Sequence, residues 1–234
     1  DSMTSGFQAN NLIILAARPS VGKTSLALDI ARNAAVRAKV PVGIFSLEMS
    51  KEELVDKILC AEAGVSMTKM RSGHLNDRSE DDDFPRIGAA MGALSDAPIF
   101  IDESSSNNIM QIRLKARRLQ AEHGLSLVIV DYLQLIQPRA NIDSMVQQVT
   151  EFSRGLKSMA RELNVPVLAV SQLSREVDKR EIKRPRLADL RESGAIEQDA
   201  DVVMFIYRKD HDRLNPTAEE ENTAEIIIAK HRNG

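Results

Sequence analysis

A glycine-containing segment near the start of the chain carries the residue types that bind nucleotide phosphates. The segment ARPSVGKT, residues 17–24, matches the phosphate-loop pattern G-x-x-x-x-G-K-S/T, except that Ala17 replaces the first glycine. In such a loop the backbone N–H groups and the start of the following helix surround the β-phosphate, and Gly22 keeps a Cβ atom out of the way. Lys23 is predicted to bridge the β- and γ-phosphates, and Thr24 to place its hydroxyl group on Mg²⁺.

An acidic residue far downstream completes this pattern. The run LVIVDY ends an apolar strand in Asp131, which has the form of a Walker B element whose carboxylate holds Mg²⁺. An apolar strand that ends in aspartate is common, but its pairing with a phosphate loop makes the interpretation specific. The next residue is Tyr132 rather than glutamate. The group that polarises the attacking water must therefore come from elsewhere.

Two glutamates are candidates for this general base. Glu48 ends the expected strand VGIFSLE at 42–48, and Glu103 ends the expected strand PIFIDE at 98–103. Ligands bind where parallel strands end, so a carboxylate there can reach the water that attacks the γ-phosphate. Glu48 is the better candidate, although it could instead be an acid ahead of a helix, for which Ser50 is the more natural cap. Glu103 remains the alternative.

Polar residues near the ends of two later strands suit contacts with a γ-phosphate. The strand VPVLAVSQL at 165–173 carries Gln172, a neutral donor that could sense the phosphate and relay its loss to the following loop. On the last strand, AEIIIAKHR at 224–232, the period of two puts Lys230 and Arg232 on one face. These two side chains could reach one γ-phosphate together, or they could form a basic cluster at the surface.

The elements that position these residues follow an alternating pattern. Short β-rich runs alternate with longer segments of helical periodicity, which predicts an α/β fold with a mostly parallel, twisted sheet and helices on both faces. The last two strands, separated by a polar insert, are expected to form an antiparallel hairpin. The expected strands are 12–17, 42–48, 98–103, 127–135, 165–173, 201–207 and 224–232. A helix expected at about 144–163 should face the core with Met145, Val149, Phe152, Leu156, Met159 and Leu163.

Three stretches lack regular signals, and loops of this length are usually functional or mobile. They are 71–85, 136–144 and 174–194. The last, SREVDKREIKRPRLADLRESG, has a modest excess of positive charge and no aromatic residue. It could contact nucleic-acid phosphates without stacking on bases, or it could be a solvated charged loop.

The composition is that of an ordinary globular protein. The 234 residues, 43% of them hydrophobic and 28% charged, fit one α/β domain. A net charge of −3 gives no bulk support for nucleic-acid binding. No apolar run is long enough for a membrane helix, and the first residues lack the features of a secretory signal, so we expect a cytoplasmic protein. The single cysteine suits a reducing compartment, and the scattered histidines indicate no zinc site.

Six motifs, in order, resemble those of the motor domain of bacterial DnaB-type replicative DNA helicases. They are ARPSVGKT, SLEMS, VIVDYLQLI, SQLSR, DLRESGAIEQDAD and AKHRNG. The resemblance spans essentially the whole chain, 1–234, and that family also tolerates alanine at position 17. It implies a single RecA-like P-loop NTPase domain, with the family's N-terminal helical domain and linker outside this chain. It also implies an ATP-dependent DNA helicase that uses ATP and Mg²⁺.

The resemblance assigns roles to the nucleotide-site residues. By this resemblance Lys23, Thr24 and Asp131 bind MgATP. Glu48 is then the catalytic base, and Gln172 is the sensor. The expected nucleotide contacts along the loop are Ser20, Val21, Gly22, Lys23, Thr24 and Ser25.

The resemblance also implies partners. Six subunits of that family form a homohexameric ring, in which Lys230 and Arg232 complete the ATP site of the neighbouring subunit. Six 174–194 loops would then line a channel for single-stranded DNA, with Arg191, Glu192 and Gly194 nearest the strand. Primase and a helicase loader are expected to bind through the full-length protein, and no membrane is involved.

Two other classes of protein share part of this pattern. A RecA-like recombinase would form open filaments instead of closed rings, and the motifs SLEMS and DYLQLI favour the helicase. A regulatory module that binds nucleotide without hydrolysing it would require replacement of Lys23, Glu48 or Asp131, and all three are present.

Overall fold

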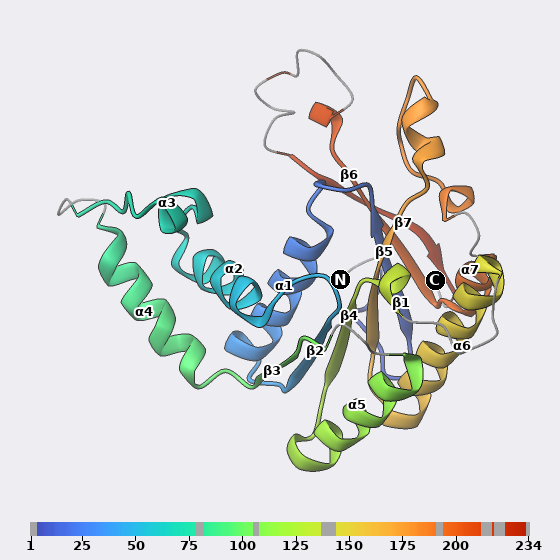
Figure 1. The fold of residues 1–234 in the computed structure, drawn as a ribbon, viewed down its shortest axis with the longest axis horizontal. Helices are drawn as coiled ribbons and strands as arrows, with labels where there is room; N and C mark the ends of the chain where they lie inside the picture. Colours follow the sequence, from blue (N-terminus) through green and yellow to red (C-terminus); the bar gives the residue numbers. More distant parts are fainter. Residues whose placement is uncertain are drawn as a thin grey trace.

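Seven strands within the described residues form one sheet (Figure 1). The computed structural model describes residues 4–77, 82–104, 108–136, 144–190, 194–211, 217 and 223–232. The strands are β1 (Leu12–Ala17), β2 (Val42–Ser46), β3 (Ile99–Asp102), β4 (Leu127–Asp131), β5 (Val167–Gln172), β6 (Val202–Tyr207) and β7 (Glu225–His231). Their order in the sheet is β3-β2-β4-β5-β1-β6-β7. Neighbouring strands run parallel except β6 and β7, which form the predicted antiparallel pair.

Helices cover both faces of this sheet. The described helices are α1 (Lys23–Arg32), α2 (Lys51–Ala63), α3 (Met67–Ser72), α4 (Asp83–Ser95), α5 (Ile109–His123), α6 (Met145–Leu163) and α7 (Gly194–Asp199). Alternate residues of β1 belong to two separate cores: Leu12 and Ile14 pack with α5, α6 and α7, whereas Ile13 and Leu15 pack with α1 and α2. Because a strand sends successive side chains to opposite faces, an all-apolar β1 requires helices on both sides. None of the helices in the described part of the chain is long and apolar enough to cross a bilayer.

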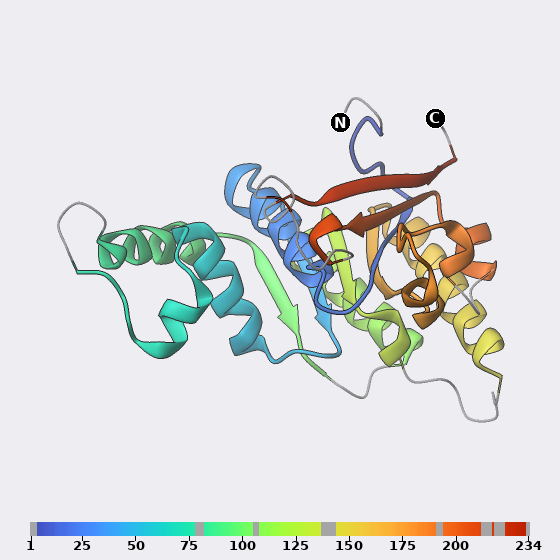
Figure 2. The ribbon, with the colours of Figure 1, turned by 90° about the horizontal axis from the view of Figure 1, so that it is seen from above.

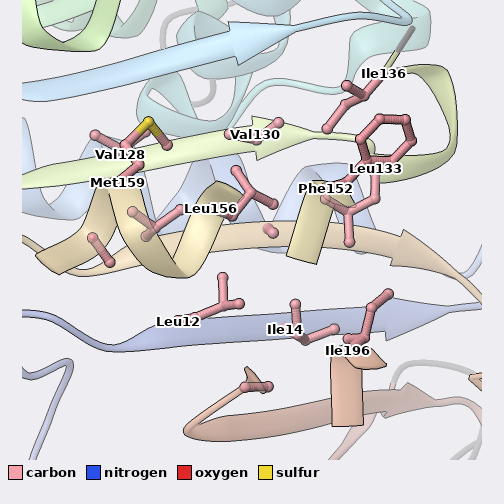
Figure 3. Packing of buried hydrophobic residues seen from close by; sticks show 14 of the residues in the cluster. Leu12, Ile14, Val128, Val130, Leu133, Ile136, Phe152, Leu156, Met159 and Ile196 are labelled. Atoms are coloured by element: carbon pink, nitrogen blue, oxygen red, sulfur yellow. The ribbon is translucent and has the colours of Figure 1, made fainter. Parts of the chain in front are cut away.

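The longest helix, α6, packs on the sheet through the predicted apolar stripe. Its residues Val149, Phe152, Leu156, Met159 and Leu163 are all buried. The side chain of Met145, the first residue expected in the stripe, lies outside the described part of the chain. Figure 3 shows three of the buried residues among side chains of β1 and β4. Full burial of a side chain such as Leu156 stabilises the fold by about 1.5–3 kcal/mol, so the stripe belongs to the core.

Helices α2, α3 and α4 extend from the β3 end of the sheet (Figure 2). The stretch 71–85, which we expected to be irregular, is helical at both ends because α3 ends at Ser72 and α4 begins at Asp83. The buried carboxylate of Asp83 accepts a hydrogen bond from the backbone N–H of Asn76 and lies 3.4 Å from Lys69 Nζ. This carboxylate holds the connection between the two helices to the start of α4.

Five expected strands, now β2, β3, β4, β5 and β7, end one to four residues earlier than the sequence pattern indicated. The strand expected at 127–135 ends at Asp131, and Leu133–Leu135 form a 3₁₀ turn, η2. Leu133 and Ile136 both enter the core beside α6, and a strand cannot place residues three apart on one face. Likewise β2 ends two residues before Glu48, and β7 ends one residue before Arg232.

Candidate nucleotide site

The phosphate loop joins β1 to α1 through two residues with left-handed backbone. Ser20 has φ 63° and Gly22 has φ 108°. A residue with a Cβ atom is strained in this region, which explains the glycine directly before α1. Gly22 has no side chain to cap the helix, so the first N–H groups of α1 are free to bind an anion. The local backbone therefore has the form that a phosphate site needs.

The side chains of Thr24 and Asp131 meet at the carboxyl ends of β1 and β4. The hydroxyl group of Thr24 donates a hydrogen bond of 2.7 Å to Asp131 Oδ2. The other carboxylate oxygen, Oδ1, is buried and has no protein partner within the described residues. Burial raises the pKa of Asp131, and the hydrogen bond from Thr24 only partly offsets this. A buried carboxylate with one unpaired oxygen beside a hydroxyl group fits the ligand preference of Mg²⁺.

Lys23 lies between an acidic and an aromatic side chain. Its Nζ atom is 3.6 Å from Glu48 Oε2 and 4.8 Å from the centre of the Tyr132 ring. Burial and the charges of Glu48 and Asp131 raise the pKa of Tyr132, so its hydroxyl group stays protonated at neutral pH. The sequence interpretation gave Tyr132 no role. Its position directly after the Walker B aspartate is the one signal that could have found it.

Glu48 is held next to Lys23 by the turn that follows β2. Ser46 pairs with Asp131 across β2 and β4, and its hydroxyl group donates to the carbonyl of Met49 at 2.7 Å. The same oxygen accepts from Met49 N at 3.1 Å, which closes the turn around Glu48. Ser50 caps α2, so the helix cap does not occupy Glu48.

The competing carboxylate, Glu103, has a different local role. It accepts a hydrogen bond of 2.6 Å from the backbone N–H of Lys51 at the start of α2. Acidic groups stabilise helix N-termini, so this contact accounts for Glu103 structurally. Of the two glutamates, the one that contacts Lys23 is Glu48.

Gln172 ends β5 directly beside the phosphate loop. It pairs in register with Ala17, and the next backbone N–H, of Leu173, donates to the Ala17 carbonyl at 3.1 Å. The side chain of Gln134, from η2, donates to Ser171 Oγ and to the Gln172 carbonyl, and accepts from Gln172 N. Gln134 thus fixes the backbone of the expected sensor. Sequence reasoning missed it, although it lies within the DYLQL motif.

Lys230 and Arg232 both reach the segment between α7 and β6. The ammonium group of Lys230 donates to the carbonyls of Glu197 and Ala200 at 2.5 and 2.7 Å. Arg232 donates to the Gln198 carbonyl at 2.6 Å. Burial, and then the charge of Arg232, lower the pKa of Lys230. The contacts recorded for these two basic side chains are with α7 and the start of β6, not with the phosphate loop of the same chain.

Two cavities flank the site region. One of about 270 Å³ lies beside the phosphate loop, and its lining includes Pro19, Val21, Pro185 and Tyr207. A larger one of about 570 Å³ is lined by residues of α2, β3 and α5, at the other end of the sheet. Of these two cavities, the smaller one contacts the phosphate loop, through Pro19 and Val21.

Comparison with protein families gives this geometry a context. The family of the DnaB-like helicase C-terminal domain matches residues 1–234. The chain belongs to this family. Two of its relatives are the replicative DNA helicase DnaB of Geobacillus stearothermophilus and the replicative DNA helicase DnaC of Bacillus subtilis (strain 168), each 52% identical over 235 residues. These alignments cover 100% of the chain and 50% of each relative, so the chain spans about half the length of the curated relatives it matches.

Two solved structures share the fold. One, described as an ATPase domain, superposes with a TM-score of 0.89 at 39% identity, over 98% of this chain and 80% of that one. The other, a DnaB-like replicative helicase described together with its interactions with primase, gives a TM-score of 0.91 at 40% identity, over 98% of this chain and 54% of that one. The predicted family and the RecA-like P-loop fold are therefore confirmed.

The expected DNA contacts of this DnaB-like domain are only partly described. Arg191 and Glu192 lie outside the described residues. Gly194 is the first residue of α7, the helix whose last turn accepts hydrogen bonds from Lys230 and Arg232. The expected loop 174–194 contains two 3₁₀ turns, η3 (Arg175–Lys179) and η4 (Leu187–Asp189), so it has regular structure that its sequence did not indicate.

Proposed function

We propose that this chain is the ATP-hydrolysing motor of a replicative DNA helicase that works as a ring of six subunits on single-stranded DNA. One observation carries the proposal: two side-chain pairs, Lys23 with Glu48 and Thr24 with Asp131, lie at the carboxyl ends of β1, β2 and β4. This is the set that ATP hydrolysis requires: a phosphate-binding cation, two magnesium ligands and a base. The names of the relatives support the helicase assignment.

The phosphate loop would bind the triphosphate of ATP. The backbone of residues 20–25 would surround the β-phosphate, while Lys23 contacts the γ-phosphate. Thr24 and Asp131 would hold Mg²⁺, which neutralises charge on the phosphate oxygens when it is bound. The cavity lined by Pro19 and Tyr207 would take the nucleoside end, because it adjoins the loop.

Glu48 would act as the general base and Gln172 as the sensor. The carboxylate of Glu48 is 46% exposed, so it can accept a proton from a water molecule at the site. Gln172 lies beside the start of the loop, where a neutral amide can form a hydrogen bond that depends on the γ-phosphate.

The remaining parts of the proposal concern neighbouring molecules. Lys230 and Arg232 would enter the ATP site of the adjacent subunit, since their contacts are with α7 and β6 rather than with their own phosphate loop. Arg191, Glu192 and Gly194 would contact the phosphates of single-stranded DNA. Primase and a loader would bind the full-length protein, and the solved relative described with primase supports the first of these partners.

Steady-state ATP hydrolysis over a protein concentration series, with and without single-stranded DNA, tests this proposal. We expect specific activity to rise with concentration and to increase on addition of DNA, because the active site is shared between subunits and coupled to DNA. Activity that depends on neither would show a self-sufficient ATPase and would contradict the ring motor.

A further inference from the structure

Arg18, the second residue of the ARPSVGKT motif, joins the phosphate loop to two other segments. Its guanidinium group donates from Nε to Asp178 Oδ1 at 3.1 Å and from Nη2 to Asp178 Oδ2 at 2.5 Å. The third nitrogen, Nη1, donates to the carbonyl of Leu173 at 2.7 Å. One side chain therefore connects the loop to the end of β5 and to η3.

The geometry distinguishes this pair from an ordinary surface ion pair. Exposed pairs with a single contact contribute little, because two flexible side chains must be ordered in a screened environment. The fork of Arg18 is fixed on both oxygens of Asp178, and its third donor is fixed on a backbone carbonyl. Such two-pronged arginine–carboxylate contacts define an orientation as well as a distance. The Arg18 side chain is only 20% exposed, whereas that of Asp178 is 47% exposed.

The segment that Asp178 belongs to is held together by its own contacts. Asp189, which is buried, accepts from Arg180 Nη2 at 2.5 Å and from Arg186 N at 2.7 Å, and its carbonyl accepts from Ser174 N. Val177 is also buried in the core. Hydrogen bonds within the segment therefore connect residues 174–190 to one another. In the sequence, this segment is followed directly by the expected DNA contact at 191–194.

Arg18 and Asp178 also lie beside the expected nucleotide site. Arg18 and Asp178 both line the cavity of about 270 Å³ beside the phosphate loop, together with Pro19 and Val21. A nucleotide whose nucleoside end enters this cavity, as proposed above, would lie against this ion pair. Arg18 also contacts the carbonyl of Leu173, the residue that directly follows the expected sensor, Gln172.

We propose that Arg18 and Asp178 are positioning residues that couple the phosphate loop to segment 174–190. Nucleotide binding at the loop sets the arrangement of segment 174–190 through the pair, and the arrangement of this segment affects the response to DNA. The coupling to DNA rests on the proposed function. The coupling between the loop and segment 174–190 requires only that a nucleotide binds at the loop.

The first experiment measures hydrogen exchange of segment 174–190 in the full-length protein. Spectra are compared for the protein alone and with a non-hydrolysable ATP analogue and Mg²⁺, in the absence of DNA. The backbone N–H groups of Val177, Arg180 and Leu190, which bond within the segment, are the reporters. We expect the analogue to slow their exchange in the wild-type protein, and Asp178→Asn to abolish that response while analogue binding persists.

Matched variants separate coupling from folding. Asp178→Glu retains the charge and should restore the response in part. Arg18→Lys retains the charge but loses the two-pronged contact with Asp178. This variant should therefore lack the exchange response to the analogue. Glu176→Gln alters another acid of η3, whose partner Lys179 lies within the same turn, and should behave as wild type. If the two residues act as a unit, the double variant Arg18→Gln/Asp178→Asn should lose no more of the exchange response than either single variant does.

The second experiment measures ATP hydrolysis by the same proteins with and without single-stranded DNA. We expect Asp178→Asn to reduce the stimulation by DNA, which is the ratio of the rates with and without DNA at saturating ATP, by about 3- to 10-fold. A merely structural role would lower the DNA-independent rate and the stimulated rate together.

The outcomes are distinguishable from those of the proposed function. If wild-type exchange at 174–190 does not respond to the analogue, or if Asp178→Asn responds as wild type does, the coupling is overturned. If DNA fails to stimulate the wild-type protein, the proposed DNA motor is contradicted. The exchange experiment then still decides whether the loop and the segment are coupled.

Discussion

At the residue scale, the site places opposite charges where a γ-phosphate would lie. Lys23 Nζ and Glu48 Oε2 are 3.6 Å apart, and one carboxylate oxygen of Asp131 has no partner among the described residues. A lysine at this position neutralises phosphate charge, whereas the carboxylate must stay near the attacking water. The two side chains therefore have separable functions, which point changes can distinguish.

Lys23→Ala should abolish turnover. Loss of a charge that stabilises the transferred phosphoryl group costs about 10²–10³-fold in kcat, and the loss of ground-state contacts should weaken nucleotide binding as well. ATP hydrolysis and the binding of a fluorescent nucleotide, measured side by side, check both effects. Wild-type turnover in Lys23→Ala would contradict the assignment of the phosphate loop.

Glu48→Gln should retain nucleotide binding and lose hydrolysis by about 10²–10⁴-fold, because an amide cannot accept the proton. Glu103→Gln is the matched control. Its amide oxygen can still accept from Lys51 N at the start of α2, so turnover should change little. Single-turnover hydrolysis with saturating ATP measures both variants. Loss of hydrolysis in Glu103→Gln but not in Glu48→Gln would identify Glu103 as the base.

The residues whose roles could be predicted are those whose neighbours in sequence determine their place. Thr24 lies at a helix start and Asp131 at a strand end, and parallel strands bring these ends together. Tyr132 and Gln134 were missed, because their contacts depend on the 3₁₀ turn that replaces the end of an expected strand. The contact of Arg18 with Asp178 spans 160 positions, and no local pattern predicts it.

At the element scale, the turn after β2 determines where Glu48 points. The sequence predicted a strand to position 48, but the strand ends at Ser46. Beyond it, the hydrogen bond from the Ser46 hydroxyl group to the Met49 carbonyl holds the turn. Alternation of apolar residues indicates where strands lie, whereas their last residues depend on which neighbour is still available for pairing. Ser46 is the last β2 residue paired with β4.

Ser46→Ala should lower kcat about 3- to 10-fold with little change in nucleotide binding, because the turn that carries Glu48 loses both hydrogen bonds to Met49. Ser50→Ala is the control four residues later. It removes the N-cap of α2 and should cost about 1 kcal/mol of unfolding free energy without a matching loss of kcat. Denaturant unfolding and steady-state kinetics of both variants separate the two effects. Equal kinetic losses would mean that the turn acts only through stability.

At the scale of the whole molecule, the sheet places its nucleotide site and its basic C-terminal strand apart. The phosphate loop follows β1, whereas Lys230 belongs to β7 and its ammonium group is held by carbonyls at the end of α7. The fold class of such domains follows from alternating sequence patterns, whereas the strand order is seen only in the structure. An arrangement between subunits does not follow from these patterns either, because it depends on surfaces that only a neighbour completes.

Arg232→Ala should lose hydrolysis, while its own phosphate loop still binds nucleotide. Arg232 also contacts Asp201 and the Gln198 carbonyl, so its loss alone does not distinguish a role in the neighbouring site from one in its own fold. Mixing two inactive proteins does distinguish them. Arg232→Ala supplies an intact Glu48, and Glu48→Gln supplies an intact Arg232.

If Arg232 acts in the neighbouring site, random mixing of these two full-length variants creates complete sites at about a quarter of the subunit boundaries. Hydrolysis should therefore reappear on mixing, reach its maximum near equal proportions and depend on protein concentration. If Arg232 acts only within its own subunit, no boundary in any mixture combines it with an intact base, and activity stays absent at every ratio. A mixture of Arg232→Ala with wild-type protein, measured in parallel, shows whether subunits exchange. Recovery in the first mixture would place the arginine of one subunit at the ATP of the next.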